Sequence, residues 1–157
     1  MNVRDVMHDR VITCQIDDAI RTAAATLKQH NISGMPVMDG DQMGGIVTES
    51  DVLKLLEIPS HDRNLWLPSP LEIIEIPLRE LIGWEDAKKA LEDVGGQPVR
   101  TIMTKHLHTI SPDDSIEAAS TLMVDHRINR LPVVEDGVLV GIVTRGDVVA
   151  GIAGKQE

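Results

Sequence analysis

Two copies of one segment make up most of this 157-residue sequence, so both copies must adopt the same fold. Residues 3–54 align with residues 99–150 without a gap, and 18 of the 52 aligned pairs are identical. Such agreement indicates a tandem duplication rather than chance similarity. A unit of about 50 residues buries too little apolar surface to be stable alone. We therefore expect the two units to pack against one another about a pseudo-two-fold axis.

The most similar stretches of the two copies are Gly45–Asp51 and Gly141–Asp147. Each begins Gly-Ile-Val-Thr and ends in Asp before an apolar segment, which predicts a buried strand that turns directly into a helix. Thr48 and Thr144 would then be N-caps beside free amide groups that can bind an anion. The Asp three residues later could accept hydrogen bonds from a ribose diol. Thr-x-x-Asp is also the pattern of an ordinary capping box, so the motif leaves both interpretations open.

The spacing of apolar residues predicts the element order β-α-β-β-α in each copy. The first copy should contain a strand at 11–14, a helix at about 17–30, a hairpin at 35–47 and a helix at about 50–57. The second copy should contain a strand at 107–110, a helix that begins with Ser111 as its N-cap, a hairpin at 131–144 and a helix that ends near 153. The fold should therefore be mixed α/β (α+β), with the two units packed sheet to sheet.

An insert separates the two copies and carries five of the eight prolines of the chain. It contains one predicted helix at about 84–94, which Gly95-Gly96 should end. The insert is too apolar to be a flexible tether, so it should pack on the repeats or at a subunit interface. The expected division is a first repeat at 1–57, the insert at 58–98 and a second repeat at 99–157.

Composition argues against several classes of partner. The formal net charge of −10 opposes binding to nucleic acid or to an anionic membrane surface. The chain has no Phe or Tyr and only two Trp, so it has no aromatic row on which bases could stack. Its single cysteine, Cys14, cannot form an internal disulfide. No apolar run is long enough to span a membrane and no signal peptide is evident, so we expect a cytoplasmic protein.

The repeated pattern resembles a known family. Ile-x-x-apolar-Pro-Val, then a hairpin, then Gly-apolar-x-Thr-x-x-Asp is similar to the cystathionine-β-synthase (CBS) domain, here as a tandem pair covering about residues 3–56 and 99–153. The resemblance implies a regulatory module that binds AMP, ADP, ATP or S-adenosylmethionine in clefts between the repeats. It also implies that the chain is not an enzyme. We expect no metal cofactor.

Carried over by motif position, the resemblance assigns ribose contacts to Asp51 and Asp147 and phosphate contacts to Thr48 and Thr144. It places the adenine beside the first strand and the Pro-Val strand of each repeat, where an apolar slot would suit a base. The residues expected to contact a ligand are Val11, Thr13, Cys14, Met35, Pro36, Thr48, Ser50, Asp51, Leu107, Thr109, Ile110, Asn129, Arg130, Leu131, Pro132, Thr144, Arg145 and Asp147.

The two copies differ in charge near the expected phosphate end. The second copy has Arg130 and Arg145 where the first has Gly34 and Glu49. Guanidinium groups bind phosphate well, whereas a carboxylate repels it. We therefore expect the Thr144 cleft to prefer phosphorylated adenosines, and the other cleft to bind them more weakly or to prefer S-adenosylmethionine. If the units face each other, Arg130 could instead reach across into the other cleft.

Other functions remain open from the sequence. His106 and His108 could face one way from a strand and bind a metal, but no third ligand lies nearby. An enzyme would need a nucleophile–base pair, and none is apparent. A ligand-free module that docks an effector protein through the insert is the main alternative. By resemblance to the family, we also expect a homodimer.

Overall fold

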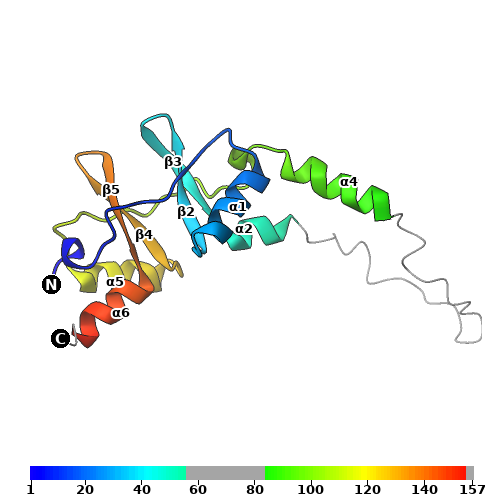
Figure 1. Cartoon of the computed structure of the whole chain (residues 1–157). Coiled ribbons are helices and arrows are strands. Elements are labelled where there is room, and N and C mark those ends of the chain that lie inside the picture. The colour runs from blue at the N-terminus through cyan, green and yellow to red at the C-terminus, as the bar shows by residue number, and fades with distance from the viewer. Residues whose placement is uncertain (56–83, 155–157) are drawn as a thin grey trace, which may run out of the picture.

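The computed structural model describes residues 1–55 and 84–154. Within these ranges, two similar units of a small sheet and two helices lie side by side (Figure 1). The α4 helix (Trp84–Gly95) follows in the chain and contacts α1 of the first unit. The rest of the insert, including any docking surface expected there, lies almost wholly outside the described residues.

The first unit has the predicted β-α-β-β-α order. Its first strand is parallel to the second, and the second is antiparallel to the third across a turn in which Gly40 has a φ of +62°. Its elements are β1 (Cys14–Gln15), α1 (Ile20–Gln29), β2 (Gly34–Asp39), β3 (Gln42–Thr48) and α2 (Glu49–Lys54).

The second unit repeats this arrangement. The strand predicted at 107–110 is reduced to a single parallel bridge between Ile110 and Val133, which occupies the place of β1. The other elements are α5 (Ile116–Asp125), β4 (Arg130–Glu135), β5 (Val138–Thr144) and α6 (Arg145–Ala153). The two sheets contact each other through β3 and β5, which confirms the predicted packing of sheet against sheet.

The first helix of each unit begins later than predicted. Ser111 is not the N-cap of α5, because Ser115 takes that position and its Oγ accepts a hydrogen bond from the amide of Ala118 over 3.1 Å. The residues before the helix form a turn instead. In that turn the Asp114 carboxylate accepts the Ser111 amide over 2.9 Å, and Asp18 accepts Gln15 in the same way over 2.8 Å.

The first residues of each repeat pack on the other repeat. We call residues 1–10 and 97–106 the leading segments. The amide of Val3 donates to the carbonyl of Asp114 in the second unit, and the amide of Val99 donates to Asp18 in the first, each over 2.8 Å. Val3 and Val99 are fully buried in the cores of the units that they join. Each folded unit is therefore completed by the leading segment of the other repeat.

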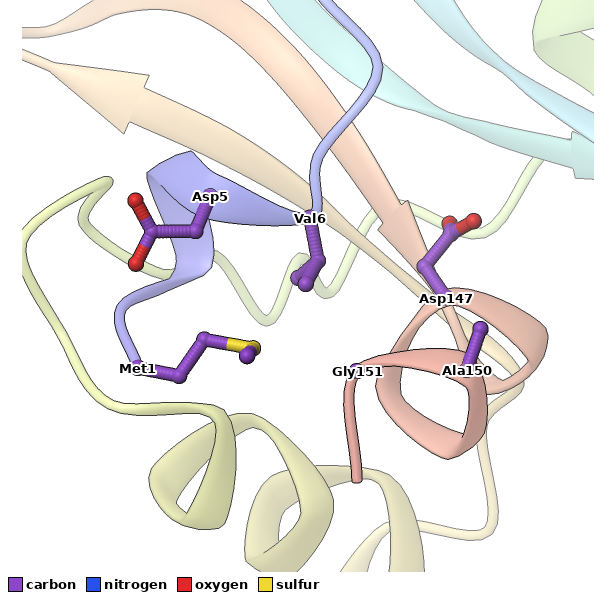
Figure 2. Close-up of a pocket in the computed structure, with 6 residues that line it drawn as sticks. All are labelled: Met1, Asp5, Val6, Asp147, Ala150 and Gly151. Carbon is purple, nitrogen blue, oxygen red and sulfur yellow. The ribbon is translucent and has the colours of Figure 1, made fainter. Parts of the chain in front are cut away.

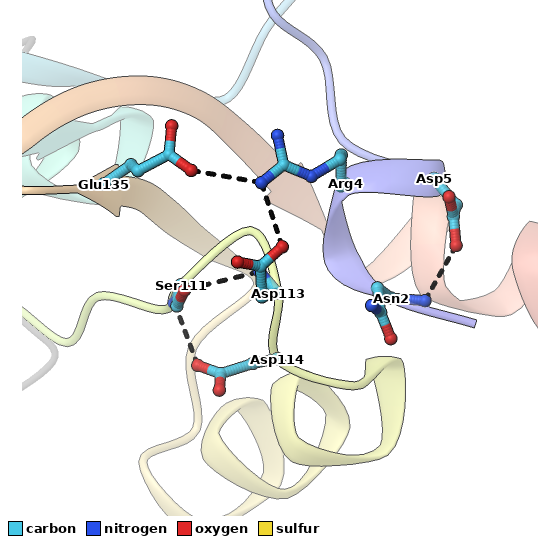
Figure 3. Close-up of polar contacts among 7 residues, drawn as sticks. All are labelled: Asn2, Arg4, Asp5, Ser111, Asp113, Asp114 and Glu135. Carbon is cyan, nitrogen blue, oxygen red and sulfur yellow. Dashed lines mark hydrogen bonds and ion pairs between the residues drawn. The ribbon is translucent and has the colours of Figure 1, made fainter.

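Ion pairs follow the same exchange. Arg4 of the first leading segment pairs with Asp113 over 2.9 Å and with Glu135 over 3.1 Å, both in the second unit (Figure 3). Arg100 of the second leading segment pairs with Asp17 in the first unit. All these side chains are about half exposed or more, so each ion pair contributes little to the stability of the fold.

The exchange explains why the repeated motif begins with glycine. A Cβ atom on Gly45 would lie 2.7 Å from the carbonyl oxygen of Thr104, and one on Gly141 would lie 3.0 Å from that of His8. Both oxygens belong to leading segments that pair with the strand beside the glycine, in the bridges Ile46–Thr104 and His8–Ile142. Only a residue without a side chain allows this close approach.

Two apolar cores lie between the sheets and their helices. The core of the first unit consists of Cys14, Ala23, Leu27, Met35, Val37, Val47 and Val99. The core of the second consists of Val3, Ile110, Ala119, Met123, Leu131, Val133, Val143 and Val148. Among the described residues, no helix is both long enough and apolar enough to span a bilayer.

Candidate ligand-binding clefts

The Thr-x-x-Asp motifs form capping boxes at the starts of α2 and α6. In the first, Thr48 Oγ1 accepts the Asp51 amide over 3.3 Å, while Asp51 Oδ2 accepts the amide and the hydroxyl of Thr48 over 2.8 and 3.0 Å. In the second, Asp147 Oδ2 accepts the amide and the hydroxyl of Thr144, each over 2.7 Å. The capping interpretation is thus confirmed in both copies, and it uses only one oxygen of each carboxylate.

The second carboxylate oxygen of the capping-box Asp has different surroundings in the two copies. Oδ1 of Asp147 lies 2.9 Å from Nε2 of His8, a residue of the first leading segment. The Asp147 side chain is 16% exposed and that of His8 is 65% exposed. Sequence reasoning could not find His8, because nothing in its own copy shows that this segment crosses to the second unit.

The cleft at Thr144 combines residues of both repeats. A cavity of about 260 Å³ adjoins it. The residues that line this cavity are His8, Arg10, Val11, Ile12, Ile32, Gly34, Ile142 and Thr144. Residues near the start of the first repeat, His8, Arg10, Val11 and Ile12, therefore line a cavity with Thr144, the capping threonine of the second repeat.

The cleft at Thr48 is likewise composite. A cavity of about 360 Å³ adjoins it, and the second repeat contributes half of its wall. The residues that line it are Ser33, Thr48, Glu49, Ser50, Arg127, Ile128, Asn129 and Arg130. Expected ligand residues of different repeats thus meet here, namely Ser50 with Asn129 and Arg130.

Arg130 lies at the Thr48 cleft and not at the Thr144 cleft, which corrects the first assignment made from the sequence. Its Nη1 donates to the carbonyl oxygen of Gly34 over 2.6 Å, and Nη2 donates to Ser33 Oγ. Gly34 leaves the room that this crossing needs, since a Cβ there would lie 3.1 Å from the Arg130 guanidinium carbon. Burial lowers the pKa of Arg130, and nearby Glu49 opposes that shift.

The remaining expected site residues fall into two groups. Met35, Pro36, Leu131 and Pro132 are fully buried, and Cys14 and Ile110 nearly so. Burial raises the pKa of the Cys14 thiol to about 11, with a smaller contribution from the charge of Asp18. Partly or largely exposed are Thr13, Leu107, Thr109 and Arg145.

The two histidines considered for a metal do not gather further ligands. The imidazole of His108 stacks on that of His126, with ring centroids 3.6 Å apart and planes 19° from parallel. Within residues 1–55 and 84–154, no group of three His, Cys, Asp or Glu side chains is placed to hold a metal ion.

Comparison with known proteins agrees with the duplicated fold. The CBS domain family profile matches residues 3–58 and again residues 99–154. The chain belongs to the CBS-domain family. As a CBS pair it is 38% identical over 154 residues to the uncharacterized protein MJ1426 of Methanocaldococcus jannaschii, a match that covers 97% of this chain and 91% of that protein.

Solved structures of other CBS pairs have the same fold. One is the CBS domain of a CBS domain-containing membrane protein from Sphaerobacter thermophilus, with 34% identity, a TM-score of 0.70 and coverage of 95% of this chain and 86% of that one. Another is the CBS domain pair of protein MJ0100 in complex with 5′-methylthioadenosine and S-adenosylmethionine. It shows 25% identity, a TM-score of 0.70 and coverage of 99% and 98%.

Proposed function

We propose that this CBS pair is a regulatory module that binds an adenosyl ligand in the clefts at Thr48 and Thr144. The carboxylate of Asp51 carries the proposal. Asp51 is 8% exposed, its Oδ2 is held by Thr48, and its Oδ1 is left to accept hydrogen bonds from a ribose diol. The similar CBS pair of MJ0100 binds 5′-methylthioadenosine and S-adenosylmethionine, which supports this ligand class.

The charge at the Thr48 cleft favours a phosphorylated ligand. Arg127 and Arg130 line its cavity together with the single carboxylate of Glu49. Guanidinium groups form charge-assisted hydrogen bonds to phosphate and have a fixed planar geometry. We therefore assign AMP, ADP or ATP to the Thr48 cleft, in place of the Thr144 cleft. The cavity at Thr144 is lined by one guanidinium group, that of Arg10, so the Thr144 cleft would bind phosphorylated adenosines more weakly.

A binding role fits the capping boxes better than catalysis. The hydroxyls of Thr48 and Thr144 each donate to the neighbouring Asp carboxylate, and the same carboxylate oxygen also accepts the threonine amide, so both groups serve the helix cap. Incubation of purified protein with ATP should give no ADP above the background rate. Steady turnover that is lost in both Asp51→Ala and Asp147→Ala would instead show an enzyme.

Thermal unfolding in the presence of AMP, ADP, ATP and S-adenosylmethionine tests the binding proposal. A ligand at 100 times its Kd should stabilise the protein by about 2.7 kcal/mol. Asp51→Ala should reduce the shift given by the nucleotides, whereas Asp41→Ala, an exposed hairpin substitution, should leave it unchanged. A flat response to all four compounds would favour the ligand-free interaction module.

We also propose that the chain forms a homodimer through its helices. Val124 of α5 and Val149 and Ile152 of α6 are 69%, 60% and 70% exposed. α5 and α6 contact each other, and exposed apolar side chains on adjacent helices are typical of a protein interface. Light scattering should give twice the chain mass of 17.2 kDa, and Val149→Lys combined with Ile152→Lys should give the monomer. An effector protein remains a further partner to be identified by co-purification.

A further inference from the structure

The carboxylates of Asp51 and Asp147 occupy equivalent positions but have different partners. Asp147 Oδ1 lies 2.9 Å from His8 Nε2, so both of its oxygens already accept hydrogen bonds from the protein. The residue equivalent to His8 at the other cleft is Thr104, and no side-chain contact joins it to Asp51 among the described residues. One ribose acceptor is therefore open and the other is occupied.

His8 can leave Asp147 without any movement of the backbone. Its amide donates to the carbonyl of Ile142, and the Ile142 amide donates back to His8, each over 2.9 Å. These two hydrogen bonds fix the leading segment to β5, while 65% of the His8 side chain is exposed. A rotation about its side-chain bonds is enough to break the pair.

The pair lies where two cavities approach each other. His8 lines the cavity of about 260 Å³ at Thr144. Asp147 lines a second cavity of about 600 Å³, beside Met1, Val6 and Gly151 (Figure 2). Figure 2 shows the Asp147 carboxylate directed away from the Met1 side chain, at the rim of this second cavity. The imidazole of His8 therefore links the Asp147 carboxylate to the cavity at Thr144.

We propose that His8 is a specificity-determining residue of the Thr144 cleft, whose imidazole must leave Asp147 before a ribose diol can bind there. The inference rests on the proposed function, since it concerns the same adenosyl ligands. Every ligand in this cleft must compete with an existing hydrogen bond, whereas a ligand at Asp51 does not. The Thr48 cleft should therefore fill first, and the Thr144 cleft only at higher concentration.

Calorimetry on the full chain tests the inference, with AMP and S-adenosylmethionine as separate probes. The background variant Asp51→Asn isolates the Thr144 cleft. In it, His8→Ala should raise the affinity of the probe about tenfold. His8→Gln keeps a hydrogen-bond donor for Asp147, so it should raise the affinity less. Thr104→Ala, the equivalent change at the other cleft, should have no effect.

The outcomes separate this inference from the proposed function. Equal affinities with and without His8, in a protein that binds a probe, would overturn the role of His8 and leave the binding function standing. Failure of both probes to bind the wild type and every variant would overturn the proposed function, and the inference with it. Weaker binding on His8→Ala would show that the imidazole contacts the ligand instead of competing with it, which would also overturn the inference.

Discussion

Arg130 donates a hydrogen bond to the carbonyl oxygen of Gly34, the residue that occupies its own position in the other repeat. The two positions are related by the pseudo-two-fold axis, so one large and one absent side chain share a space that two arginines could not. Arg130 belongs to the second repeat, but its guanidinium group lies at the Thr48 cleft, beside the capping threonine of the first repeat.

Conservative replacement of Arg130 should weaken nucleotide binding at the Thr48 cleft. Lysine keeps the charge but cannot donate to Gly34 and Ser33 at once, so Arg130→Lys should lower AMP affinity about tenfold. Calorimetry measures this directly. Arg145→Lys is the matched control and should change little. A loss of AMP affinity in Arg145→Lys alone would restore the assignment of phosphate to the Thr144 cleft.

A methyl group at the start of the first repeated motif should destabilise the fold. In Gly45→Ala the new Cβ would meet the Thr104 carbonyl oxygen at 2.7 Å, and backbone atoms cannot move aside easily. Overpacking of this kind typically costs about 1–3 kcal/mol, which denaturant unfolding will detect.

Gly146→Ala provides the control for that substitution. Gly146 lies in the first turn of α6, and its Cβ would have its nearest contact at 3.6 Å, with Thr144 Oγ1. Alanine should be neutral there or stabilise the helix by up to about 1 kcal/mol. Equal losses of stability in Gly146→Ala and Gly45→Ala would show that the close approach of the leading segment is not the cause.

The capping threonine of α6 should contribute to stability through its hydroxyl. Thr144→Val retains the shape of the side chain but loses the bonds to Asp147, so the free energy of unfolding should fall by about 1 kcal/mol. Thr144→Ser keeps the hydroxyl and should retain most of that stability. If the two variants unfold alike, the hydroxyl is not the stabilising group.

Because the leading segments are exchanged, a substitution in the leading segment of one repeat should destabilise the unit formed by the other repeat. Val3 belongs to the first repeat but is fully buried in the core of the second unit. Val3→Ala should cost about 2 kcal/mol, and hydrogen exchange should accelerate in β4 and β5 more than in β2 and β3. Val138→Ala, at an exposed position, should leave both sheets protected.

The order of elements could be predicted from the sequence because it depends on local patterns. The apolar spacing of α1 and the Asp39-Gly40 turn are visible within one copy, and duplication confirms them in the other. The composition of each cleft could not be predicted in the same way. It depends on which repeat receives each leading segment, a choice set by packing around Val3 and Val99 that leaves no local pattern.

The charge difference between the copies illustrates the same limit. The sequence shows Arg130 opposite Gly34, and the possibility of a crossing follows from the symmetry. Whether the Arg130 side chain crosses depends on free space beside position 34. The folded structure shows that Gly34 leaves this space. The contact of His8 with Asp147 leaves no sequence signal, since the counterpart of His8 in the other repeat is the uncharged Thr104.

Cys14 should be an unreactive thiol in the folded protein. It is 6% exposed, and burial raises its pKa to about 11. Because the thiolate is the nucleophile, iodoacetamide at pH 8 should modify the native protein far more slowly than the denatured chain. Rapid modification of the native protein at that pH would show that Cys14 is accessible and ionised.

The same shift gives stability a pH dependence of known sign. The unfolded chain releases the thiol proton near the ordinary cysteine value, whereas the folded protein retains it up to about pH 11. The folded state therefore holds more protons in this range, and the free energy of unfolding should fall as the pH rises through it. Urea unfolding at several alkaline pH values measures the slope. Cys14→Ala has no thiol to ionise and should show a shallower slope, while equal slopes would assign the pH dependence to other groups.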